Sequence, residues 1–218
     1  MIIIKNKFLG KMVLVNEIKT VLKYSNTEFK EKGSRFIGQI YHVENEEEVT
    51  SILDEIKKNH YNATHHCYAY RFMNNEFKYS DDGEPNGTAG IRIFNALQHF
   101  ELVNNIIVVI RYYGGTKLGV GPLGKAYYKS AHETIEKSNI STLENFSKMK
   151  ISYDYDFSSQ VHYLLNQFNC QIQENKFDKM PYITFLIKMS LIDEMKQKLK
   201  ELSSGKYEST IETENIFR

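Results

Sequence analysis

The clearest alternation of apolar and polar positions lies in the last third of the chain. Apolar residues occupy every second position from Ile151 to Phe157, which is typical of a half-buried strand. The pattern then predicts, in order, a helix over 159–168, a weaker strand over 170–177, a turn over 178–181, a strand over 183–189, a helix over 191–202 ended by Gly205, and a strand over 207–216. The order βαββαβ predicts a ferredoxin-like domain.

The preceding part of the chain also mixes strands and helices. Val49, Ile52 and Ile56 have helical spacing between glutamates and lysines, and predict a helix over 46–60 whose charges complement its dipole. The run IIVVI within 105–113 predicts a strand that is buried on both faces. The other predicted elements are strands over 20–26 and 34–43, a hairpin over 66–72 and 77–79 around Asn74–Asn75, and helices over 90–100 and 124–138.

Two domains are predicted from the break between these patterns. The polar stretch Ser141–Ser147 separates them, and most of the 12 glycines lie before it. A chain of 218 residues has room for one or two domains. We therefore expect an N-terminal domain over 15–140 and a C-terminal domain over 147–218.

Composition narrows the class of protein. With 28 Lys and Arg against 27 Asp and Glu, the net charge of +1 excludes a globally basic nucleic-acid binder but leaves a local basic face open. Cys67 and Cys170 are too few and too far apart for a disulfide framework or a zinc site, which favours the reducing cytoplasm and no metal. Lys5 and Lys7 interrupt the apolar start, so we expect no signal peptide and no membrane partner.

A glycine-rich loop after the buried strand is the first candidate for chemistry. Gly119, Gly121 and Gly124 fit a dinucleotide-loop spacing, and Lys125 completes a P-loop-like one. Both matches are weak, because Ala126 has no oxygen for Mg²⁺ and the loop does not begin at the end of the strand. The favoured interpretation is structural, with glycines that allow positive φ angles and close helix packing.

Charge around this loop is more informative. Between Asn86 and His132 the only acid is Glu101. The basic residues there are Arg92, Arg111, Lys117, Lys125 and Lys129, and the interleaved aromatic residues are Tyr112, Tyr113, Tyr127 and Tyr128. Such a face suits contacts to phosphates and bases, and a solvated face with tyrosines in the core is the equal alternative.

Two further segments have a structural and a chemical interpretation. In SDDGEPNGTAG (80–90) three clustered carboxylates suit Mg²⁺ or acid–base chemistry, but a turn with Thr88 as helix cap is favoured.

Alternation along the strand that follows Thr64 sends His65 and Cys67 to one face and His66 to the other. A hydrolase would need a base for Cys67, and the possible bases are His42, His99 and His132. A buried structural cysteine is the favoured interpretation.

Four motifs in order carry a family resemblance. GSRFIG (33–38), ATHHCYAYRF (63–72), SDDGEPNGTAG (80–90) and VVIRYYGGTKLGVGPLGKAY (108–127) together resemble the YigZ/IMPACT family. Residues 1–12 resemble an extension before the start of that family. The resemblance implies an α+β fold, with an N-terminal domain similar to elongation factor G domain IV (βαβ-type, ribosomal-protein-like) and a ferredoxin-like C-terminal domain. It also implies a link to translation, since eukaryotic relatives regulate translation by protein–protein contact.

These observations together predict a non-catalytic cytoplasmic protein without a cofactor, which binds RNA or a ribosome-associated factor and modulates translation. One alternative is an enzyme that acts on a phosphate-bearing small molecule between the SDDGEP loop and the glycine loop, since the same fold hosts small-molecule kinases. The other is a pure protein-interaction module.

Lys125 is expected in the first helical turn, where a cation opposes the dipole and favours a bound anion. The predicted anion- and nucleic-acid-binding residues are His66, Asp82, Glu84, Arg92, Arg111, Tyr112, Tyr113, Lys117, Lys125 and Lys129. Of these, the arginine at 111 and the three lysines are expected to contact phosphates, the histidine and tyrosines to stack on bases, and the two acids to brace the facing loop.

Overall fold

The computed structural model describes residues 15–177, 180–203 and 207–218. The predictions for the N-terminal extension, for the first half of the 178–181 turn and for Gly205 lie outside these residues. The chain divides into two compact units, one of Lys19–Thr142 and one of Leu143–Arg218 with the described residues up to Ile18. Each unit has an antiparallel sheet and helices, as the predicted α+β class requires.

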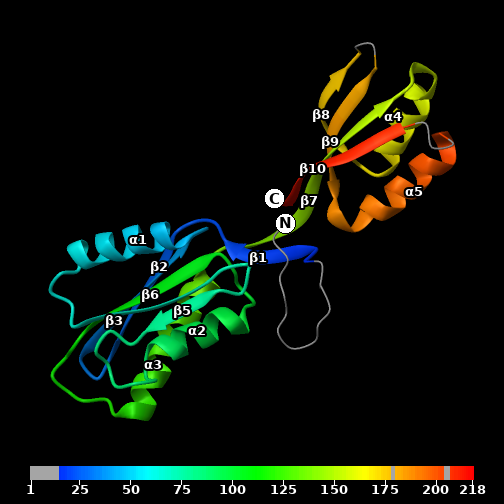
Figure 1. The fold of residues 1–218 in the computed structure, drawn as a ribbon. Helices are drawn as coiled ribbons and strands as arrows, with labels where there is room; N and C mark the ends of the chain where they lie inside the picture. Colours follow the sequence, from blue (N-terminus) through cyan, green and yellow to red (C-terminus); the bar gives the residue numbers. More distant parts are fainter. Residues whose placement is uncertain (1–14, 178–179, 204–206) are drawn as a thin grey trace. The chain divides into compact units, whose positions relative to one another are not determined.

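The unit Lys19–Thr142 is a five-stranded antiparallel sheet with helices on both faces. Its elements are β2 (Ser25–Glu31), β3 (Ser34–His42), α1 (Glu46–Asn59), β4 (His65–Arg71), β5 (Phe77–Ser80), α2 (Gly90–His99), β6 (Asn105–Tyr112) and α3 (Val120–Lys137). The strand order is β2-β3-β6-β4-β5. Helix α1 covers one face of the sheet, and α2 and α3 cover the other (Figure 1).

The central strand β6 has a core on each side, as its apolar run predicts. Ile107 and Val109 pack toward α2 and α3, whereas Ile106, Val108 and Ile110 pack toward α1. All five side chains are fully buried. Burying each of them stabilises the fold by roughly 1.5–3 kcal/mol, so β6 anchors both layers of helices to the sheet.

Helix α3 begins earlier than its pattern predicts. The expected start was residue 124, but the helix begins at Val120, after Gly119 with φ 87°. Pro122 lies within the first turn, where a residue without an N–H loses no hydrogen bond. Lys125 therefore lies in the second turn, and the expected opposition between its charge and the helix N-terminus is wrong.

The second unit has the predicted βαββαβ order. Its elements are β7 (Ile140–Tyr153), which begins in the first unit, a 3-10 turn (Tyr155–Phe157), α4 (Ser158–Gln167), β8 (Gln171–Lys176), β9 (Tyr182–Lys188), a 3-10 turn (Met189–Leu191), α5 (Ile192–Ser203) and β10 (Tyr207–Phe217). The sheet runs β10-β7-β9-β8, and β1 (Glu17–Val21) also pairs with β7. Numbering the four strands from β7 gives the order 4-1-3-2, so the C-terminal unit is ferredoxin-like.

The polar stretch Ser141–Ser147 lies inside β7, because its backbone is paired despite the polar side chains: the Asn145 N–H donates to the Asn16 carbonyl, and Glu144 exchanges hydrogen bonds with Arg218. The boundary between the two compact units, between Thr142 and Leu143, falls within this stretch. One expectation here is wrong, because the strand predicted to reach Phe157 ends at Tyr153. Residues 155–157 form a 3-10 turn in which the Phe157 N–H donates to the Asp154 carbonyl.

Candidate nucleic-acid interface

The SDDGEPNGTAG loop caps helix α2. The Asp81 carboxylate accepts hydrogen bonds from the backbone N–H groups of Gly87, Ala89 and Gly90 at 2.8–2.9 Å. A negative charge on free N–H groups at a helix N-terminus is a favourable arrangement. The turn-and-cap interpretation is therefore correct, but the expected cap Thr88 is wrong, because its hydroxyl donates to the Pro85 carbonyl. Asp81 precedes the helix by nine residues, outside the usual cap position.

Glu84 and Arg111 form a buried ion pair. Glu84 is 8% exposed and Arg111 is 5% exposed. One Glu84 oxygen accepts from Arg111 Nη1 and from the Tyr127 hydroxyl, and Arg111 Nη2 donates to Ser34 Oγ. Glu84 therefore contacts the sheet and α3 from inside the loop. The sequence predicts that Arg111 contacts phosphate, but the structure places its guanidinium in the interior with Glu84 and Ser34 as partners.

The Tyr127 side chain is fully buried, and burial, with Cys67 and Glu84 nearby, raises the pKa of its hydroxyl. His65 approaches the same carboxylate of Glu84, with Nε2 3.8 Å from its second oxygen. His65 Nδ1 donates to the Asp82 carbonyl at 2.7 Å. The motif residues thus converge on Glu84 in one largely buried cluster.

Three of the predicted residues lie on the α1 face of the sheet or at its rim: His66, Asp82 and Tyr112. The Asp82 carboxylate accepts from the His66 N–H at 2.6 Å, and His66 Nε2 donates to the His60 carbonyl. The Tyr112 hydroxyl hydrogen-bonds to His60 Nδ1, and the Arg35 guanidinium lies 4.3 Å from the Tyr112 ring centre. The predicted separation of His66 from His65 and Cys67 is confirmed, and it removes His66 and Tyr112 from the glycine-loop side.

Cys67 cannot serve as the nucleophile of a hydrolase. It is fully buried, its Sγ donates to the Asp81 carbonyl at 3.0 Å, and burial raises the pKa of the thiol. None of the three possible bases reaches it: His42 bonds to Thr20, and His99 and His132 pack against each other. The buried structural interpretation of Cys67 is correct.

We expect alkylation at pH 8 to modify Cys67 of the folded protein at least about a hundredfold more slowly than in urea, because only an accessible thiolate reacts. Mass spectrometry of peptides after timed iodoacetamide treatment measures both rates. Cys170 serves as an internal comparison, since it is partly exposed although burial raises its pKa to about 12. Equal rates for Cys67 in the folded and unfolded protein would contradict the assignment.

The groove with unsatisfied positive charge lies between α2 and α3. It has a volume of about 470 Å³ and is lined by Arg92, Asn95, Gly121, Gly124, Lys125 and Tyr128. Arg92 comes from α2 and Lys125 from α3. A Cβ at Gly124 would lie 3.3 Å from Arg92 Nε, so the glycine lets the arginine lie close against α3. Gly124 therefore allows close packing, as the structural interpretation expects, and this packing brings Arg92 to the groove.

The two cations of this groove lack the carboxylate partner that a nearby lysine of α3 has. Within the residues that the structure describes, neither Arg92 nor Lys125 takes part in an ion pair or side-chain hydrogen bond. Lys129, in contrast, lies 3.8 Å from Glu133 and over the Phe29 ring. Lys117 is exposed in the loop before α3. The groove thus has two cations free to meet an anion.

The structure therefore divides the ten predicted residues. Arg92 and Lys125 share the groove; Lys117, Lys129 and Tyr113 lie outside its lining; Glu84 and Arg111 are internal; and His66, Asp82 and Tyr112 lie elsewhere. Asn95 was missed. Tyr128 was named among the interleaved aromatic residues but not among the ten, although it stands three residues after Lys125, a helical spacing that indicates a shared face.

Among the described residues, no helix is long and apolar enough to cross a membrane. In the same part of the chain, no group of three or more His, Cys, Asp and Glu side chains is placed to hold a metal ion.

Known proteins resemble this chain over most of its length. Residues 32–135 match the Impact N-terminal domain. The IMPACT family member YvyE of Bacillus subtilis (strain 168) is 32% identical over 189 residues, which cover 86% of this chain and 87% of that protein. The IMPACT family member YigZ of Escherichia coli (strain K12) is 27% identical over 178 residues, covering 80% and 87%.

A solved structure shares the fold. The crystal structure of a hypothetical protein superimposes with a TM-score of 0.62 at 24% identity, and covers 90% of this chain and 97% of that one. The four ordered motifs, the matched domain and the YvyE alignment agree, and the chain belongs to the IMPACT family.

Proposed function

We propose that this protein binds RNA through the groove between α2 and α3, and that it modulates translation by this binding without catalysing a reaction. The observation that carries the proposal is the pair of cations Arg92 and Lys125, which line one groove without a carboxylate partner among the described residues. An ion pair would have to be broken before such a group could bind phosphate. Here both charges are available at no such cost.

The surroundings of the pair suit a phosphate backbone. Gly121 lies in the first turn of α3, where backbone N–H groups have no partner within the helix. Lys117, exposed in the preceding loop, adds charge near the same end of α3. Tyr128 and Asn95 supply an aromatic face and a polar amide for the sugar and base.

The overall charge limits the mode of binding. With a net charge of +1, the protein has no general attraction for a polyanion, so its affinity must come from this local face. Phosphate contacts of this kind carry little sequence information. The expected ligand is therefore RNA recognised by its backbone and exposed bases, in keeping with the link to translation that the family resemblance implies.

Replacing Arg92 and Lys125 together with alanine should weaken RNA binding at low salt by at least about tenfold. Each lost phosphate contact should also reduce the slope of log affinity against log salt by about 0.7 for single-stranded RNA. Fluorescence anisotropy of a labelled mixed-sequence oligoribonucleotide across a salt series measures both quantities.

The matched control removes two exposed lysines from α1, on the other face of the sheet: Lys57→Ala with Lys58→Ala. This variant loses the same charge, so it should show the general effect of charge alone. Wild-type affinity of the Arg92/Lys125 variant at every salt concentration, or an equal loss in the control, would refute the proposed site.

A further inference from the structure

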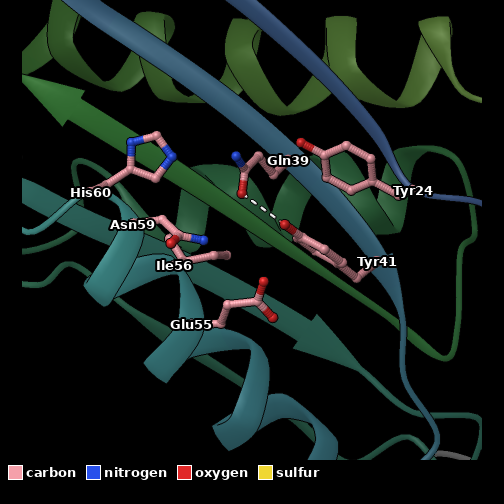
Figure 2. Close-up of a pocket in the computed structure, with 7 residues that line it drawn as sticks. All are labelled: Tyr24, Gln39, Tyr41, Glu55, Ile56, Asn59 and His60. Atoms are coloured by element: carbon pink, nitrogen blue, oxygen red, sulfur yellow. Dashed lines mark hydrogen bonds between the residues drawn. The ribbon is translucent and has the colours of Figure 1, made fainter.

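A second groove lies on the other face of the same sheet, beside α1 (Figure 2). It has a volume of about 330 Å³ and is lined by Tyr24, Gln39, Tyr41, Glu55, Ile56, Asn59 and His60. Strand β3 supplies Gln39 and Tyr41, and α1 supplies Glu55. None of these residues belongs to the α2–α3 groove, so the two sites are separate.

Gln39 brings an unused donor to this groove. The residue is 8% exposed, and its Oε1 accepts a hydrogen bond of 2.9 Å from the Tyr41 hydroxyl. That bond leaves the amide nitrogen as the free end of the side chain. Across the described residues this nitrogen has no hydrogen-bond acceptor. This nitrogen is not one of the fully buried polar atoms without a partner, so solvent reaches it, and an acceptor on a ligand can replace that water.

Glu55 brings an unused acceptor from the opposite wall. Its side chain is directed from α1 toward the space beside Tyr41 (Figure 2). In the described part of the chain its carboxylate has neither an ion pair nor a hydrogen bond. The pKa of Tyr41 on β3 is raised mainly by burial, with contributions from Tyr24 and from the negative charge of Glu55. The groove thus offers a donor on the strand side and an anionic acceptor on the helix side.

Aromatic rings form the rest of the lining. Tyr24 is 50% exposed, and its ring centre lies 4.9 Å from that of Tyr41. The Tyr24 hydroxyl accepts from Asn26 Nδ2 at 2.8 Å, which holds the exposed ring in position. Burial, with His66 and Arg35 nearby, lowers the pKa of His60, so its imidazole is neutral at neutral pH. A planar ring can therefore stack on Tyr24 without meeting a positive charge from the lining.

We propose that this groove binds a guanine base. Guanine presents a carbonyl acceptor, O6, beside two donor groups, N1–H and the N2 amine. Gln39 would donate to O6, the Glu55 carboxylate would accept from N1–H and N2–H, and Tyr24 would stack on the ring. Adenine offers an amine to the donor of Gln39 and a bare nitrogen to the carboxylate, so both of its contacts are mismatched. The volume lies at the lower end of small-molecule sites and suits one nucleoside.

Isothermal titration of the full chain with GMP and AMP tests this proposal, because the two ligands carry the same sugar and phosphate. We expect GMP to bind at least about tenfold more tightly than AMP, since each well-formed pair of base contacts discriminates by about that factor or more. IMP lacks the N2 amine and should fall between them. Equal affinities for GMP and AMP, or no heat from GMP at about 5 mM, would overturn the proposal.

Variants locate the site. Glu55→Gln should weaken GMP at least about tenfold, whereas Asp54→Asn, at the neighbouring exposed position of α1, should leave the affinity unchanged. Tyr24→Ala, at a half-exposed position before β2, should also weaken GMP. The Arg92/Lys125 double variant separates this proposal from the RNA groove, because it should bind GMP normally. Loss of GMP in that variant, or wild-type GMP affinity in Glu55→Gln and Tyr24→Ala, would assign the ligand to another site.

Discussion

Replacing Glu84 with alanine is expected to lower the free energy of unfolding of the Lys19–Thr142 unit by about 3–5 kcal/mol. Arg111 stays buried in this variant but loses the carboxylate that neutralises it, and the buried Tyr127 hydroxyl loses its acceptor. A buried cation without a counter-charge is costly because the low-dielectric interior solvates it poorly. Urea unfolding, with hydrogen exchange of the β6 amides as the probe specific to this unit, measures the loss.

The control for Glu84→Ala is Glu133→Ala, which removes the partner of Lys129 on the surface of α3. That pair is exposed to solvent, so its loss should change stability by no more than about 1 kcal/mol. Adding Arg111→Met to Glu84→Leu should recover part of the stability, because no buried charge remains. If Glu84→Ala costs no more than Glu133→Ala, the buried pair does not have the role assigned to it.

Replacing Gly114 with alanine is the second change expected to have a large effect. A Cβ at this position would lie 1.9 Å from the Gly33 carbonyl carbon and 2.3 Å from the Ser34 nitrogen. Both neighbours are backbone atoms, so no side chain can rotate away, and the loop after β6 must move from the start of β3. We expect a loss of about 3 kcal/mol or more, at the upper end of the cost of overpacking. The same urea measurement applies.

Gly121→Ala is the matched control for Gly114→Ala. Nothing lies within 4 Å of a Cβ at Gly121, which is in the first turn of α3. Alanine there should be neutral or should stabilise the protein by up to about 1 kcal/mol, because it restricts the unfolded chain and favours the helix. Similar effects of the two substitutions would mean that the close approach of Gly114 to Gly33 does not constrain the fold.

Much of the secondary structure could be predicted because its signals are local. The apolar run of β6, the spacing of Val49 and Ile56 in α1 and the βαββαβ order each depend on neighbours within one element. The predictions failed at the ends of elements: the strand predicted to reach Phe157 gives way to a 3-10 turn after Tyr153, and α3 begins at Val120, before its apolar pattern. In both cases the backbone, not the side chains, set the boundary.

The candidate site was predictable only in part. Arg92 and Lys125 stood out as basic residues among few acids, and the structure places them in one groove. Arg111 had the same signal but is internal, because its partner Glu84 lies 27 residues earlier and meets it only after the sheet has formed. A charge pattern cannot distinguish a free cation from a paired one when the partner is distant in the chain.

By itself, the sequence determined the two-part α+β organisation, the buried central strand, the alternation that separates His65 from His66 and the family resemblance. These follow from periodicity and from ordered motifs, which are properties of short segments. Only the tertiary structure decided that Asp81 caps α2, that Glu84 neutralises Arg111, and that Gln39 and Glu55 face one groove. The physical reason is that hydrogen-bond satisfaction and burial depend on groups from several elements, and packing alone brings those groups together.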